Sequence, residues 1–279
     1  MDGLSIQSEF ELPDAALSPN QFKLAQLDLT DSLSKWRLWT YLGWNDIKMR
    51  YRGSVLGPFW ITASMLIFIT AFSMVYSRLL NQPIKEYVPF LTAGYLVWLM
   101  IASVLTESCN TFVEAASFIT EIKLPYSMYI FRVSWRHIII FFHNILVYIA
   151  VVLYFKVQIN WSILYVIPGL FLVTLNLAAI GLLLSILGAK YRDIPQVVTS
   201  VIQVLFFVTP ISWAPNLLNN SMVILYNPLN YFIDLVRSPL LGHAPSSMSW
   251  VVSATLTLLV FAGSFVLFAR FRRNIPFWL

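Results

Sequence analysis

Three cations alternate along the chain where a polar segment gives way to an apolar one. Lys48, Arg50 and Arg52 are followed closely by Gly53 and Gly57. An arginine guanidinium can bind two phosphate oxygens in a planar fork, and glycine permits tight turns because it lacks a Cβ. The stretch therefore predicts either an anchor at a membrane surface or a binding site for a phosphate-bearing lipid head group. The candidate head-group residues are Lys48, Arg50, Tyr51, Arg52, Gly53 and Gly57.

The composition of the chain is that of a membrane protein. Of its 279 residues, 58% are hydrophobic and 11% are charged, and the mean hydropathy is +0.73. A soluble domain carries roughly 25% charged residues. The sole cysteine, Cys109, excludes an intrachain disulfide. The acidic N-terminus lacks the basic and apolar regions of a signal peptide. We therefore expect an all-α integral membrane protein.

Two segments precede the apolar part of the chain. Residues 1–32 mix acids, prolines and scattered apolar residues, and we expect a mostly irregular cytosolic tail. Residues 33–48 place three tryptophans on one side of a helical wheel and bases on the other. This pattern predicts an amphipathic helix lying in the membrane interface. The alternative is an amphipathic helix packed on a protein core.

Six segments are candidates for membrane spans, each of which needs about 20 mainly apolar residues. They are residues 59–80, 88–109, 133–155, 163–187, 196–213 and 250–270, of which the fifth is short. The segments assigned to the cytosol contain fourteen Lys and Arg residues. Those assigned to the outside contain four, Arg78, Lys85, Lys156 and Arg237. This asymmetry favours a membrane domain at residues 49–271, a cytosolic tail at residues 272–279, and both termini in the cytosol.

Residues 214–247 are apolar enough to suggest a seventh span, but polar residues interrupt them. A charge at the centre of the bilayer costs at least a few kcal/mol, and a seventh span would also place the C-terminal arginines outside. We predict two short re-entrant helices that are broken near Asn227 and Pro228. Such backbone persists only against protein or a water-filled cavity, which suggests a gate at the outer mouth. The candidate gate residues are Asn227, Pro228, Asp234 and Arg237.

Two short connections on the predicted cytosolic side are charged and end in proline. Residues 114–125 can form a helix of two to three turns, and residues 188–195 form a tight loop. A soluble partner could push on the membrane domain at such segments. The alternative is plain surface loops whose bases set the topology. The candidate coupling residues are Glu114, Glu121, Lys123, Arg192 and Asp193.

The sequence lacks the motifs of an enzyme or a nucleotide-binding protein. It contains no G-x-x-x-x-G-K-[ST] motif to cradle ATP phosphates. His137 and His143 are six residues apart and fall on opposite sides of a helix, so we expect no metal site. Acids at mid-bilayer positions are too few for a proton relay. We expect no catalysis, no cofactor and no nucleic-acid partner, and an energy source outside this chain.

Five motifs together resemble the membrane subunit of type-2 ABC exporters. They are RYRGSVLGPFW at residues 50–60, KLP at 123–125, YRDI at 191–194, TPI at 209–211 and NPLNYFIDLVR at 227–237. Within that family, the chain is similar to the exporters of polysaccharides and polyol phosphates, which move O-antigen, capsule or teichoic acid chains. The resemblance covers about residues 34–271.

The resemblance implies a homodimer of this subunit with two separate ATPase subunits, which bind ATP and Mg²⁺. It also implies an interface helix, two coupling segments, re-entrant gate helices and a location in the cytoplasmic, inner membrane. The implied substrate is a lipid-linked polysaccharide, O-antigen foremost, carried on a polyprenyl diphosphate or similar lipid.

Aromatic side chains are the residues expected to line the implied channel. Phe68, Phe72 and Tyr76 repeat every four residues and share a helical face, and Trp98 lies in the second predicted span. Sugars can stack on such faces, although each aromatic could instead pack against protein or lipid. Export of a drug or small lipid is an alternative function. A polyprenyl-phosphate-dependent glycosyltransferase is another, but it needs an acidic or metal-binding cluster that the sequence does not offer.

Overall fold

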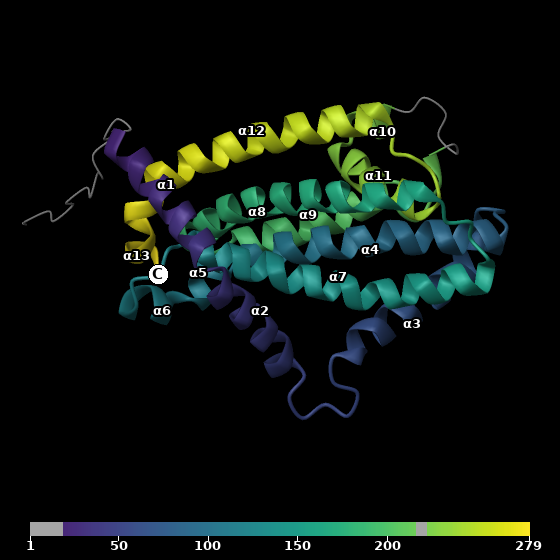
Figure 1. The fold of residues 1–279 in the computed structure, drawn as a ribbon, viewed down its shortest axis with the longest axis horizontal. Helices are drawn as coiled ribbons and strands as arrows, with labels where there is room; N and C mark the ends of the chain where they lie inside the picture. The colour runs from purple at the N-terminus through teal and green to yellow at the C-terminus, as the bar shows by residue number, and fades with distance from the viewer. Residues whose placement is uncertain (1–18, 216–221) are drawn as a thin grey trace, which may run out of the picture.

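A computed structural model describes residues 19–215 and 222–279 of the chain. Those residues form helices joined by short loops, with no strand among them. The long helices lie roughly side by side, and α1 (Pro19–Ser34), α5 (Thr111–Glu114), α6 (Ala116–Glu121) and α13 (Ile275–Trp278) gather at one end of the bundle (Figure 1). The predicted all-α architecture is confirmed.

Five helices are long and apolar enough to cross a membrane, so the chain is a multi-pass membrane protein. They are α3 (Phe59–Leu79), α4 (Ile84–Ser108), α7 (Ser127–Phe155), α8 (Val166–Lys190) with the short helix η1 (Trp161–Tyr165) before it, and α12 (Ser247–Phe271). The fifth predicted span corresponds to α9 (Ile194–Val208), which has 15 residues. At 1.5 Å per residue it extends roughly 22 Å, less than the ~30 Å hydrocarbon core. A count of six spans therefore stays a prediction.

The core of the bundle surrounds α4, which packs against α3, α7, α8 and α11 (Pro228–Leu240). Close backbone approach fixes the end of this core where α4 ends and α8 ends. A Cβ placed on Gly188 of α8 would lie 1.8 Å from the carbonyl oxygen of Cys109. No side chain fits there, so this glycine lets α8 contact the end of α4 directly.

The N-terminal region is more helical than its sequence suggests. Helix α1 covers residues that were expected to be irregular, and that prediction is wrong for residues 19–32. Residues 1–18 lie outside the described residues. The predicted interface helix begins three residues later and ends two residues later than expected, as α2 (Trp36–Arg50).

Helix α2 divides its tryptophans between two environments. Trp39 packs on Phe131 and Trp135 of α7, and its indole N–H donates to the carbonyl oxygen of Ser32. Trp36 and Trp44 are instead exposed. The predicted single apolar face is therefore wrong in detail, because Trp39 is a packing residue. The other two tryptophans remain available to a membrane surface.

Between residues 222 and 246, the described part of the segment predicted to be re-entrant forms two helices, α10 (Met222–Tyr226) and the 13-residue α11. They are broken at the predicted position. The Asn227 side chain accepts a hydrogen bond from the Leu229 N–H, and Pro228 occupies the first turn of α11. An Asn cap followed by proline is a typical helix start. Neither helix is long enough for a seventh span.

Candidate functional site

The segment between α2 and α3 extends away from the bundle (Figure 1). Its two glycines have left-handed backbone angles, with φ of +80° at Gly53 and +54° at Gly57, and a Cβ on either would meet nothing within 4 Å. These glycines are therefore needed for the backbone conformation of the turn, and not to make room for a neighbouring atom. Val55 is fully exposed at 100%, and Phe59 is exposed as well. Cations beside exposed apolar side chains suit the surface of a membrane.

Glu107, near the end of α4, gathers cations from two other helices. Its Oε1 atom lies 2.9 Å from Nη2 of Arg50 on α2. Its Oε2 atom lies 2.8 Å from Nε2 of His137 on α7 and also pairs with Arg136. Burial lowers the pKa of the Arg50 guanidinium, but the hydrogen bond and charge of Glu107 outweigh burial, so the net pKa is raised. Arg50 is therefore a permanent cation.

Asp46 on α2 extends this network. Its Oδ2 atom accepts hydrogen bonds from Arg136 at 2.7 Å and from Nε of Arg132 at 2.8 Å, and its Oδ1 atom pairs with Nη2 of Arg132 at 2.5 Å. Two carboxylates thus hold α2, α4 and α7 together through charge-assisted hydrogen bonds. The sequence reasoning missed this network, because its members come from distant parts of the chain.

The three predicted head-group cations have different surroundings. Arg50 is paired with Glu107, and the ammonium of Lys48 lies 5.6 Å from the centre of the Trp44 ring. Arg52 is exposed and forms no ion pair within residues 19–215 and 222–279. Of the two arginines, Arg52 therefore has the guanidinium that is more available to a phosphate.

The predicted aromatic face of α3 forms a continuous stack. The ring centres of Phe68 and Phe72 are 5.1 Å apart, and those of Phe72 and Tyr76 are 3.9 Å apart. Tyr95 of α4, which was not among the predicted site residues, stacks on Phe68 at 4.1 Å with an interplanar angle of 11°. Trp98 is 5% exposed, so within a single chain it is a packing residue.

Helix α9 adds an exposed polar stripe beside this stack. Phe206 contacts Phe72, Tyr95 and Trp98 edge-on or at a tilt. On the neighbouring side of the helix, one line of side chains carries exposed hydrogen-bonding groups, namely Gln196, Thr199, Ser200 and Gln203. No residue of α9 is buried. Polar groups at membrane depth rarely face lipid, so this stripe suits either a partner subunit or a water-filled path.

The two segments predicted to couple to a partner are exposed at the end of the bundle where α1 and α13 lie. Glu114 ends α5, Glu121 ends α6, and Lys123 follows in a loop, all of them exposed. Two large apolar side chains one turn apart, Phe118 and Ile122, are 51% and 47% exposed. Exposed apolar groups among charges favour a protein partner.

The second coupling segment is a turn between α8 and α9. Asp193 is exposed just before α9. Arg192 donates from Nη2 to the carbonyl oxygen of Trp278 at 3.4 Å, so this turn lies beside α13.

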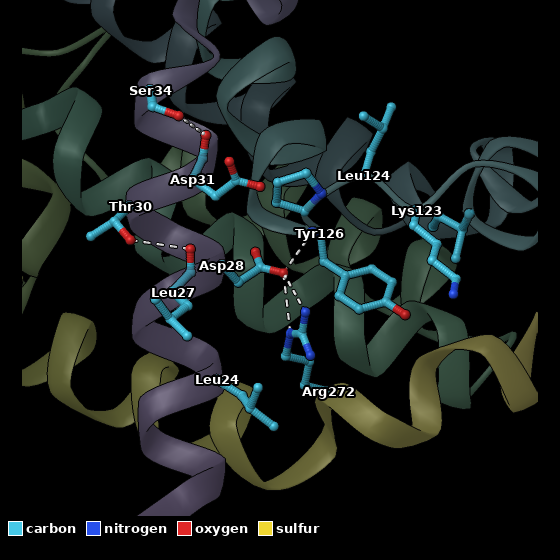
Figure 2. Close-up of a pocket in the computed structure, with 12 residues that line it drawn as sticks. Leu24, Leu27, Asp28, Thr30, Asp31, Ser34, Lys123, Leu124, Tyr126 and Arg272 are labelled. Atoms are coloured by element: carbon cyan, nitrogen blue, oxygen red, sulfur yellow. Dashed lines mark hydrogen bonds and ion pairs between the residues drawn. The ribbon is translucent and has the colours of Figure 1, made fainter.

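A buried aspartate anchors α1 next to these segments. The carboxylate of Asp28 accepts from the backbone N–H groups of Tyr126 and Ser127, both at 3.0 Å, and from Nε of Arg272 at 3.1 Å. Figure 2 shows the Arg272 side chain reaching Asp28 beside the Tyr126 ring, whose centre is 5.2 Å from the guanidinium. Asp28, Tyr126 and Arg272 are among the residues that line an open pocket of about 800 Å³. The contacts of Asp28 tie α1 to the start of α7 and the end of α12.

Two of the predicted gate residues, Asn227 and Arg237, contact the turn that follows α9. Arg237, which is 5% exposed, donates from Nη1 to the carbonyl oxygen of Pro210 at 2.6 Å and lies over the Phe90 ring at 4.5 Å. Asn227 donates from Nδ2 to Oγ1 of Thr209 at 2.9 Å. The TPI motif, residues 209–211, is thus hydrogen-bonded to both Asn227 and Arg237, at the start and in the last turn of α11.

Asp234 is directed to another helix. Its carboxylate accepts from Oγ of Ser249 at 2.5 Å, from the N–H of Ser246 at 3.3 Å and from the Ser238 hydroxyl. It therefore holds α11 to the start of α12 instead of pairing with Arg237.

The described residues contain no group of three His, Cys, Asp or Glu side chains that could hold a metal ion. Their clustered polar side chains instead bind one another across helices. The arrangement thus consists of an exposed cationic segment after α2, an aromatic stack beside the polar stripe of α9, two exposed charged connections, and a turn after α9 to which α11 is hydrogen-bonded.

Comparison with known proteins gives a consistent result. The family described as ABC-2 type transporter matches residues 37–241, well over half of the chain. A protein named O-antigen export system permease protein RfbA, from Klebsiella pneumoniae, is 27% identical over 223 residues, which cover 76% of this chain and 85% of that protein. A protein of the same name from Myxococcus xanthus is 18% identical over 189 residues, which cover 66% of this chain and 72% of its own length. The chain therefore belongs to the ABC-2 type transporter family of membrane proteins.

Proposed function

We propose that this chain is the transmembrane subunit of an ATP-driven exporter of a lipid-linked polysaccharide, most closely O-antigen. The observation that carries the proposal is the aromatic stack of Phe68, Phe72 and Tyr76 beside the polar stripe of α9. Aromatic faces hold the apolar faces of sugar rings, and amide and hydroxyl groups exchange hydrogen bonds with sugar hydroxyls. A surface with both and no fixed charge lets a long polymer slide. The names of the relatives support this substrate class.

The polymer's diphosphate enters at the segment after α2. Arg52 and Lys48 meet the phosphate oxygens first, and Arg50 joins them by exchanging Glu107 for phosphate. This exchange releases one of the bonds that hold α2 to α4. Tyr51 and the turns at Gly53 and Gly57 shape the segment around the head group.

The energy comes from a separate subunit. Two copies of this chain pair with two ATPase subunits, which bind ATP and Mg²⁺, and this chain catalyses no reaction itself. The exposed Phe118 and Ile122 with Glu121 and Lys123 form one contact, and the turn at Arg192 and Asp193 forms the other. Both chain termini lie on this cytosolic side of the inner membrane.

The outer end of the path is closed by α10 and α11, which act as a gate in the outer leaflet. Asn227 and Arg237 fix the gate to the end of α9, and Asp234 fixes it to α12. Pro228 sets the break between the two gate helices.

Complementation tests this function. In a strain whose O-antigen permease is deleted, co-expression of this chain with its ATPase subunit is expected to restore polysaccharide at the cell surface. It should also remove the lipid-linked polymer that accumulates inside. Persistence of that polymer, with the chain inserted in the membrane at normal levels, would overturn the proposal. Copurification of the ATPase subunit, weakened by Phe118→Ser with Ile122→Ser, tests the coupling surface separately.

A further inference from the structure

A second site lies on the opposite end of α3 from the entrance segment. A groove of about 980 Å³ opens between α3, the start of α4 and the end of α7. Its walls are mainly apolar, with Leu66, Ile69 and Met74 on one side and Val151 and Tyr154 on another. This volume is at the upper end of the range of small-molecule sites, roughly 300–1,000 Å³.

Two cations line this groove, and a third follows the groove-lining part of α3. Lys85 in the first turn of α4 and Lys156 at the end of α7 line it. Arg78 lies on α3 one turn beyond the lining residue Met74. All three are exposed, and none forms an ion pair with any residue in the described ranges. The acid nearest in sequence, Glu86, is exposed and does not line the groove.

This grouping is unusual for the outer end of the protein. The segments assigned to that side contain only four bases, and the fourth, Arg237, is buried and bound to the Pro210 carbonyl. Basic residues on this side are disfavoured by the rule that sets membrane topology. Two of them lining one groove, with Arg78 one turn beyond its lining residue Met74, therefore point to an anionic ligand.

The distance along α3 from the lining residue Leu66 to Arg78 is close to the depth of one leaflet of a bilayer. Twelve residues separate Leu66 from Arg78 on α3, which at 1.5 Å per residue is roughly 18 Å. Half of the hydrocarbon core is about 15 Å. A lipid chain that lies along the groove therefore brings its phosphate to the level of the three cations.

We propose that this groove binds an anionic glycerophospholipid of the outer leaflet, with its phosphate among Arg78, Lys85 and Lys156 and one acyl chain along α3 and α7. The site is separate from the transport path. The groove-lining residues Ile69, Thr70 and Ser73 lie on a different face of α3 from the stacked Phe68 and Phe72. This separation favours a resident membrane lipid over the transported one.

Native mass spectrometry of the purified membrane protein tests the proposal, with phosphatidylglycerol and phosphatidylcholine of equal chain length as probes. Wild type is expected to retain one phosphatidylglycerol that phosphatidylcholine does not replace. Neutralising the three cations with Arg78→Gln, Lys85→Gln and Lys156→Gln should lower this retention by at least about tenfold, since each base near a lipid surface contributes about 1 kcal/mol. The matched control, Lys23→Gln with Arg37→Gln and Arg273→Gln, removes the same charge at the other end and should retain the lipid.

A second variant tests the groove itself. Ala150→Trp places a large side chain inside the groove on an exposed position of α7, and Ile149→Trp places it on the neighbouring face. Only the first should lose the lipid. Equal retention by Ala150→Trp and Ile149→Trp would overturn the proposal, as would equal loss in the charge control. Equal binding of phosphatidylcholine, or displacement of phosphatidylglycerol by an equal amount of polyprenyl diphosphate, would also overturn it.

Discussion

Arg50 and Glu107 join the end of α2 to the last turn of α4 across 2.9 Å, although they are 57 residues apart in the chain. Because of this pair, Arg50 and the nearby Arg52 have different surroundings. Arg50 contributes to a network that holds α2, α4 and α7, whereas Arg52 is exposed without an ion pair among the described residues. Head-group recognition is therefore best probed at Arg52, where a substitution leaves the network intact.

Arg52→Lys should reduce export of the lipid-linked polymer roughly tenfold. Lysine keeps the charge and the topology but loses the planar fork, and hydrogen bonds to charged groups contribute about 1.5–3 kcal/mol. Export is measured as surface polysaccharide, with protein level as a check. Arg37→Lys, at another exposed arginine, is the control and should export normally. Normal export from Arg52→Lys would reduce the segment to an anchor.

Asp28→Ala should destabilise the protein by about 3–5 kcal/mol, because it leaves Arg272 and two backbone N–H groups without their buried acceptor. Thermal unfolding of the protein in detergent measures the effect. Asp31→Ala removes an acid one turn later on α1 that pairs with Lys35 in solvent. That exposed pair contributes about 0.5 kcal/mol or less. Similar losses in both variants would contradict a role for Asp28 as the anchor of α1.

Gly188→Ala should cost about 1–3 kcal/mol, since the added Cβ would lie 1.8 Å from the Cys109 carbonyl oxygen and α8 must move. Gly263→Ala is the matched helical control. A Cβ there meets nothing within 4 Å, so this variant should be neutral or more stable. Unfolding temperatures of the two variants decide the matter, and unchanged stability of Gly188→Ala would show that the two helices separate at no cost.

Replacing the polar stripe of α9, with Gln196→Leu, Ser200→Leu and Gln203→Leu together, should lower export at least about tenfold. Each lost hydrogen bond contributes about 0.5–1.5 kcal/mol. Membrane insertion and thermal stability should not change, because no residue of α9 is buried. The control replaces the exposed apolar stripe, with Val197→Leu, Val201→Leu and Val204→Leu, and should export normally. Loss of dimerisation in the polar variant alone would instead assign the stripe to a contact between subunits.

Local patterns predicted much of the fold. Long apolar segments gave the five long helices, since hydropathy and length are properties of each segment alone. The four-residue spacing of Phe68, Phe72 and Tyr76 predicted in the same way that they share one face of a helix, where their rings stack. The break before α11 followed from an Asn cap and a proline, which act within one helical turn.

Contacts between distant segments could not be predicted. Helix α1 was missed because its buried residues include the polar Asp28 and Ser32, whose partners lie almost a hundred residues away. The network of Glu107 and Asp46 was missed for the same reason. Trp39 was expected at the membrane interface, but its ring packs on Phe131, a contact that the sequence of α2 alone does not specify.

Helix α9 begins at the exposed turn of Arg192 and Asp193 and ends at Thr209, to which Asn227 is hydrogen-bonded. The helix is thus connected at both ends, to the exposed turn before it and, through Thr209, to Asn227. An α-helix resists compression along its axis, because each backbone hydrogen bond runs nearly parallel to that axis. Under the function proposed above, a displacement of this turn by the ATPase subunit would be transmitted along α9 to α11. Movement of the coupling contact and opening of the gate would then be one event.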